Sequence, residues 1–110
     1  MNQKGLRSAN VYYQKELAGI LEETERGVRF VYTEEFLKNG KPLSVSLPLN
    51  KEPFESEELF PFFQGILPEG WYLEIVCKTA KIDPRDKFGL LLATARADTI
   101  GAVTVQPNKT

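Results

Sequence analysis

Few side chains in this sequence could carry out a reaction. The chain has no histidine and one cysteine, Cys77, so the commonest general base, the activated Ser or Cys nucleophile and a cysteine-rich zinc site are excluded. No glycine-rich run has the form that cradles a phosphate group. The carboxylates Glu69 and Glu74 lie near an apolar segment, but a helix start and an i,i+4 pair with Lys78 explain both. The sequence therefore predicts a protein that is not an enzyme and that uses no cofactor and no metal.

In the helix expected at 68–80, apolar residues cover more of the circumference than a single contact with the core would bury. In projection, Trp71 and Ile75 lie at the edge of a narrow polar strip formed by Glu74 and Lys78. Trp71 is either a protruding residue that binds a partner, a role in which tryptophan is favoured, or a core residue folded back over the phenylalanines before it. The opposite side of the helix is apolar: Leu73, Val76, Cys77 and Ala80.

Two residue sets follow from this segment. The predicted partner-binding residues are Pro68, Glu69, Gly70, Trp71, Glu74, Ile75 and Lys78. The predicted core residues are Phe60, Phe62, Phe63, Leu67 and Cys77.

Size and composition predict one domain. The chain has 110 residues, 42% hydrophobic and 26% charged, which suits a globular protein with a single modest core. No apolar run approaches the roughly 20 residues of a membrane helix, and the polar N-terminus is no secretory signal. We expect one domain over 1–110, with its core at about 10–106, in a cytoplasmic protein. The net charge of −1 argues against direct DNA binding, which draws on Lys and Arg.

Charge is spread unevenly along the chain. An acidic cluster precedes a basic one, and each is either a solvated face or a means of steering a protein partner. The acidic cluster comprises Glu52, Glu55, Glu57 and Glu58; the basic cluster comprises Lys78, Lys81, Arg85 and Lys87.

The first half of the chain has the residues of antiparallel strands. Aromatic and β-branched residues predict strands at 11–13, 17–21 and 28–32, joined by polar turns. A half-buried strand is expected at 43–47, where apolar residues alternate with serine after an Asn-Gly turn. A last strand is expected at 102–105.

The second half predicts about three helices. Ser56 or Glu58 would cap a short helix that ends near Phe63, with Pro61 restricting its first turn. The second helix is the one at 68–80, whose proline and glutamate suit a first turn.

Asp83 would cap a third helix, with Pro84 first inside it and Asp86 three residues after the cap. Gly101 would end the helical part. Strands, then helices, then one returning strand predict an α+β fold, with a small antiparallel or mixed sheet. The third helix would bury a stripe of Phe88, Leu91, Leu92 and Ala95.

Several motifs occur together along the chain: SLPL at 46–49, LFPFF at 59–63, LPEGW at 67–71, FGLL at 88–91 and IGAV at 100–103. With the early hairpin at 12–22, they resemble the N-terminal subdomain of HipA-type kinases, in order, from about Asn10 to Val105. The segment 96–98, Arg-Ala-Asp, departs from the glycine that members often carry before the acidic residue.

The resemblance implies a function. In HipA proteins the subdomain precedes a Ser/Thr kinase core, and a free-standing copy is similar to HipS, the antitoxin subunit of bacterial HipB–HipS–HipT toxin–antitoxin systems. It therefore implies a type II antitoxin that inhibits a HipA-like or HipT kinase toxin and reaches DNA only through HipB, a helix-turn-helix protein. The alternative is the N-terminal subdomain of a longer HipA-like kinase, with a structural role.

Overall fold

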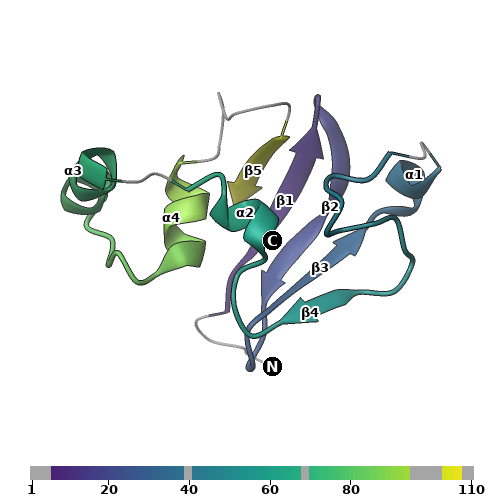
Figure 1. Cartoon of the computed structure of the whole chain (residues 1–110), viewed down its shortest axis with the longest axis horizontal. Coiled ribbons are helices and arrows are strands. Elements are labelled where there is room, and N and C mark those ends of the chain that lie inside the picture. Colours follow the sequence, from purple (N-terminus) through teal and green to yellow (C-terminus); the bar gives the residue numbers. More distant parts are fainter. Residues whose placement is uncertain (1–5, 39–40, 68–69, 95–102, 108–110) are drawn as a thin grey trace.

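The residues that the structure describes form a five-stranded antiparallel sheet accompanied by four short helices (Figure 1). A computed structural model describes residues 6–38, 41–67, 70–94 and 103–107, and for Trp71 the backbone alone. The strands are β1 (Ser8–Tyr13), β2 (Glu16–Glu23), β3 (Val28–Tyr32), β4 (Phe54–Ser56) and β5 (Val103–Pro107), in the order β4-β3-β2-β1-β5. The helices are α1 (Glu34–Leu37), α2 (Pro61–Gln64), α3 (Gly70–Ala80) and α4 (Lys87–Thr94). The expected α+β class is confirmed, with a purely antiparallel sheet.

The three N-terminal strands form the expected meander. Gln14 and Lys15 both have positive φ, 50° and 73°, which is the two-residue hairpin turn whose twist matches its strands. β5 then pairs with β1, with Val105 opposite Val11, so the chain's last described strand lies beside its first.

One face of the sheet forms the core. Figure 1 shows α2 in front of the sheet and α4 beside α2, near β5; Phe63 of α2 and Phe88 and Leu91 of α4 belong to the core. The Phe30 ring on β3 lies 5.8 Å from that of Phe63 on α2, and both side chains are fully buried. Gly19 on β2 makes room for this packing, because a Cβ there would lie 2.6 Å from Cζ of Phe30. Of the predicted core residues, Phe60 and Phe63 are buried, whereas Phe62, Leu67 and Cys77 are half-buried.

The expected strand at 43–47 is wrong. These residues form a tight turn, in which Leu47 donates its N–H to the Ser44 carbonyl at 3.0 Å and Ser46 donates to Ser44 Oγ at 3.2 Å. Serine side chains that bond to nearby backbone compete with a sheet ladder. The strand that pairs with β3 is β4 instead, which includes Glu55 of the acidic cluster.

Two expected helix caps are also wrong. α2 begins at Pro61 without a side-chain cap, and Ser56 ends β4. Asp83 does not cap α4 but accepts the Arg85 N–H at 2.9 Å in a turn. Asp86 is the residue that accepts the Gly89 N–H, at 3.0 Å, so α4 starts later than expected.

A further helix, α1, was not expected. Its cap is Thr33, whose hydroxyl accepts the Phe36 N–H at 3.1 Å. In α4, Phe88 and Leu91 are buried and Leu92 is half-buried, as expected. Ala95, Gly101 and the Asn-Gly turn lie outside the described residues.

Candidate partner-binding surface

Helix α3 lies apart from the sheet. Figure 1 shows it at one end of the molecule, beyond α4. Isolated helices shorter than about 12–15 residues are marginal in water, and α3 has 11 residues. The helix therefore depends on contacts along its own sides, either within the chain or with another molecule.

The ends of α3 are defined locally. Gly70 has a φ of +60° with nothing near the place of a Cβ, so the backbone conformation itself favours glycine there. At the other end Lys81 has a φ of 58°, and Ile82 donates its N–H to the Cys77 carbonyl at 3.0 Å. This is the 6→1 hydrogen bond of a Schellman ending.

The two sides of α3 differ in exposure. Leu73, Val76 and Cys77 are half-buried, as the helical projection predicted. On the outer side, Tyr72 is 50% exposed and Ile75 is 48% exposed. These two lie three residues apart, which places them next to each other on one surface stripe.

The structure describes only part of the predicted binding set. Pro68 and Glu69 lie outside the described residues, as does the Trp71 side chain, so its role stays a prediction. Glu74 and Lys78 are both exposed, and the ion pairs of the described residues do not include the expected pair between them. Tyr72 was missing from the predicted set, although its i,i+3 spacing to Ile75 could have indicated it.

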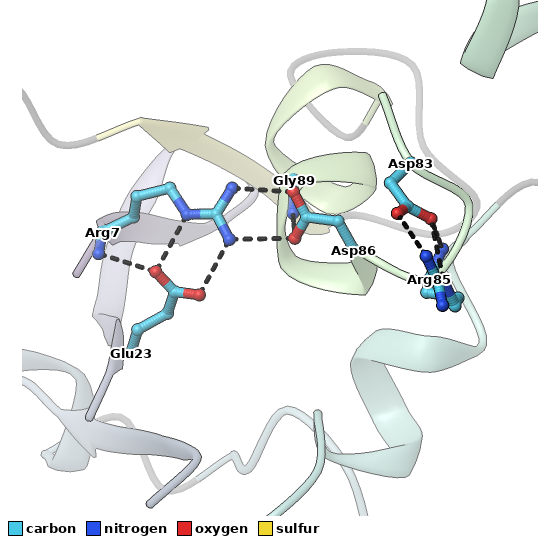
Figure 2. A network of polar contacts seen from close by, with 6 residues as sticks. All are labelled: Arg7, Glu23, Asp83, Arg85, Asp86 and Gly89. Atoms are coloured by element: carbon cyan, nitrogen blue, oxygen red, sulfur yellow. Dashed lines mark hydrogen bonds and ion pairs between the residues drawn. The ribbon is translucent and has the colours of Figure 1, made fainter. Parts of the chain in front are cut away.

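The helix next to α3 is tied to the sheet by Arg7 (Figure 2). Its guanidinium donates two hydrogen bonds to Glu23 at 2.9 and 2.8 Å, and two to Asp86 at 3.1 and 2.9 Å. It also lies 5.3 Å from the ring centroid of Phe88. Because Asp86 caps α4 through Gly89, one arginine joins the end of β2 to the start of α4. We call Arg7, Glu23 and Asp86 the Arg7 network.

The charges of the Arg7 network stabilise one another. Hydrogen bonds from Arg7 lower the pKa of the Asp86 carboxyl, against the opposing effect of burial. Hydrogen bonds to Glu23 and then Asp86 raise the pKa of Arg7 further. No sequence pattern indicated this network, because Arg7 and Asp86 lie far apart along the chain. It fixes the start of α4, the helix beyond which α3 projects.

Within the described residues, no three His, Cys, Asp or Glu side chains gather where they could hold a metal ion. Nor does this part of the chain contain a helix with the length and apolar character to cross a membrane.

Both the sequence and the fold of this chain are similar to those of known proteins. The family profile described as HipA N-terminal domain matches residues 9–106. The chain belongs to the HipA N-terminal domain family. A solved structure, the N-terminal domain of HipA toxin, is 32% identical with a TM-score of 0.75, covering 100% of this chain and 99% of that one.

Two curated relatives differ in length. An uncharacterized protein of Haemophilus influenzae is 38% identical over 104 residues, which cover 94% of this chain and 95% of the relative. A protein of Sinorhizobium fredii described as a kinase, Y4mE, is 33% identical over 105 residues, 93% of this chain but 25% of the relative. A HipA N-terminal domain therefore makes up nearly all of one relative and a quarter of the other.

Proposed function

We propose that this HipA N-terminal domain is an antitoxin of the HipS type, which binds a HipA-like or HipT Ser/Thr kinase toxin, inhibits it and catalyses no reaction itself. Its similarity to a HipA toxin domain and to a kinase-described protein supports a kinase partner. The single observation that carries the binding role is α3, a helix at the end of the molecule with Tyr72 and Ile75 about half exposed.

Binding would place α3 in a groove of the kinase. An amphipathic helix that lays its apolar side in a hydrophobic groove is a recurring mode of protein recognition. We propose that Pro68, Glu69 and Gly70 would turn the chain so that Trp71 and Ile75 could enter the kinase cleft. Burying the outer stripe of α3 would also supply the contacts that a helix of this length needs.

Polar residues around α3 would form the rim of the interface. Glu74 and Lys78 flank the apolar stripe, and Lys81 and Arg85 follow it; all four side chains are exposed. Exposed cations mainly raise the rate of encounter with an acidic surface. We propose an acidic border on the kinase groove. DNA would be reached only through a HipB-like protein in the same cytoplasmic complex.

The test is co-expression with a HipA-family kinase, chosen from the genome that encodes this chain, scoring growth rescue and co-purification. Trp71→Ala should reduce affinity by about 2 kcal/mol, roughly thirtyfold in Kd, and restore toxicity. Ile75→Glu should act in the same direction. The matched control is Ala93→Glu, which adds the same charge at an exposed site on α4. If neither α3 variant differs from this control while both stay folded, α3 is not the binding surface.

A second candidate function is a structural role in a longer kinase. The match to a quarter of Y4mE favours it, because there the domain is one part of a larger chain. The two roles predict opposite results when purified chain is added to the isolated kinase. An antitoxin should reduce phosphoryl transfer, whereas a structural domain should leave it unchanged or increase it.

A further inference from the structure

The turn at residues 43–47, here called the Val45 turn, exposes one apolar side chain. Val45 is 96% exposed, while Leu47, two residues later, is 1% exposed. Leu43, at the other end of the turn, is half-buried and packs against the core. The two leucines fix the ends of the turn in the protein, and the valine between them points into solvent.

A buried tyrosine holds the turn closed. The Tyr32 hydroxyl accepts the Leu43 N–H at 3.0 Å and donates to the Leu47 carbonyl, so it bridges the two ends. Tyr32 itself is 4% exposed and is stacked on the Phe36 ring at 5.7 Å. A phenylalanine would suit these apolar surroundings without a polar group to satisfy. The hydroxyl is used entirely by the two ends of the turn.

Further constraints lie within the turn itself. The Ser44 carbonyl accepts the Leu47 N–H, and Ser44 Oγ lies 3.1 Å from Ser46 Oγ. Pro42 and Pro48 border the turn on either side, and each has a fixed φ. The conformational freedom that a surface loop normally loses on binding is therefore already restricted here.

We propose that the Val45 turn is a preformed binding protrusion, and that Val45 enters a shallow apolar pocket on the partner kinase. This proposal rests on the proposed function, to which it adds a second contact away from α3. Single exposed apolar residues are common on protein surfaces. What distinguishes Val45 is that a buried hydroxyl, two prolines and a serine carbonyl all restrict the segment that carries it.

The charges beside the turn indicate the kind of pocket. Lys41 precedes the turn and Lys51 follows it. Lys38 and Lys51 line one hollow beside Tyr32, together with a single carboxylate, Glu34. All three lysines are exposed. An apolar pocket with acidic groups at its border would complement a valine on a turn that Lys41 precedes and Lys51 follows.

Binding of the purified chain to the HipA-family kinase used in the co-expression test, also purified, tests the proposal. Val45→Ala should raise Kd about tenfold and Val45→Asp more, with thermal unfolding unchanged because the side chain touches little of its own protein. The control is Ala93→Asp, which adds the same charge at an exposed site on α4. Lys41→Glu should lower the association rate at low salt and leave it unaffected at high salt.

A double-mutant cycle separates positioning of Val45 from general stability. Tyr32→Phe keeps the ring in the core and removes the bridge across the turn, so it should weaken binding in the wild-type background. In the Val45→Ala background it should have almost no further effect on Kd. Equal weakening in both backgrounds would overturn the positioning role of Tyr32 and the preformed turn with it.

The remaining outcomes distinguish this proposal from the proposed function. If Val45→Asp binds like the control while Ile75→Glu does not bind, the Val45 contact is wrong and the antitoxin proposal stands. If the wild-type chain does not bind the kinase, both are wrong. If Val45→Asp changes only self-association of the chain, the partner is a second copy and the kinase pocket is rejected.

Discussion

Removal of the Arg7 side chain should weaken the attachment of α4 to the end of β2. In Arg7→Ala, four side-chain hydrogen bonds to Glu23 and Asp86 are lost, together with the contact on the Phe88 ring. The two carboxylates would then face each other without the cation between them. We expect a less stable domain whose sheet remains folded while α4 is held less firmly.

The size of the effect follows from the exposure of the network. The side chains of Arg7, Glu23 and Asp86 are 37%, 20% and 35% exposed. Hydrogen bonds to charged groups contribute about 1.5–3 kcal/mol when buried, whereas exposed ion pairs contribute about 0–1 kcal/mol. Because solvent screens these partly exposed charges, we take a value between the two ranges: the whole network should contribute about 2 kcal/mol to the free energy of unfolding. For a domain of this size that corresponds to a decrease in Tm of about 8 °C.

Thermal unfolding followed by circular dichroism measures this difference. The matched control is Arg85→Ala, because Arg85 also pairs with an aspartate, Asp83, at 3.1 Å. That arginine is 89% exposed and its partner lies two residues away, so the control should leave Tm unchanged. Equal shifts in the two variants would refute the reasoning, since the long-range network would then contribute no more than a local surface pair.

Three further changes test other contacts. Asp86→Asn should make the free energy of unfolding, measured with urea, depend less on pH between pH 6 and 2. Arg7 lowers the folded-state pKa of Asp86, so the stabilisation by Asp86 is present above its unfolded-state pKa, about 3.9, and is lost as pH falls through the folded-state pKa. Tyr32→Phe should make the free energy of unfolding depend less on pH above about pH 10. Burial raises the folded-state pKa of Tyr32, so the wild-type protein loses stability as pH rises above the unfolded-state pKa of about 10, and the phenylalanine variant lacks this loss. Gly19→Ala should lower the free energy of unfolding by about 2 kcal/mol, measured by calorimetry, through overlap of the added Cβ with the Val31 carbonyl oxygen and the Phe30 ring. The control is Gly65→Ala, whose Cβ would meet nothing closer than 3.5 Å.

The sequence predicted the elements whose signals are local. β1, β2 and β3 follow from aromatic and β-branched runs separated by polar turns, and α3 follows from its apolar spacing. α2 begins at Pro61, as a proline in the first turn indicates. The absence of histidine likewise excludes several kinds of catalytic site, because no fold can supply an imidazole that the chain lacks.

Three differences from the sequence predictions involve residues that are distant along the chain. The 43–47 segment alternates like a strand, but its backbone bonds to itself and to the Tyr32 hydroxyl. β4, at 54–56, has only three residues and exists because it pairs with the edge of β3. Asp86 rather than Asp83 caps α4, where it is also bound by Arg7. In each case a contact with a distant residue helped to select one of two locally acceptable conformations.

The proposed binding surfaces also depend partly on the sequence and partly on the tertiary structure. The composition and spacing of α3 are properties of the chain alone, and they determined that this helix would be apolar on more than one side. Which side stays uncovered was decided by the tertiary structure, because exposure depends on where α4 and the sheet lie. The exposure of Val45 and the Arg7 network belong to the tertiary structure entirely: hydrogen bonds and ion pairs between distant segments form only once folding has brought those segments together.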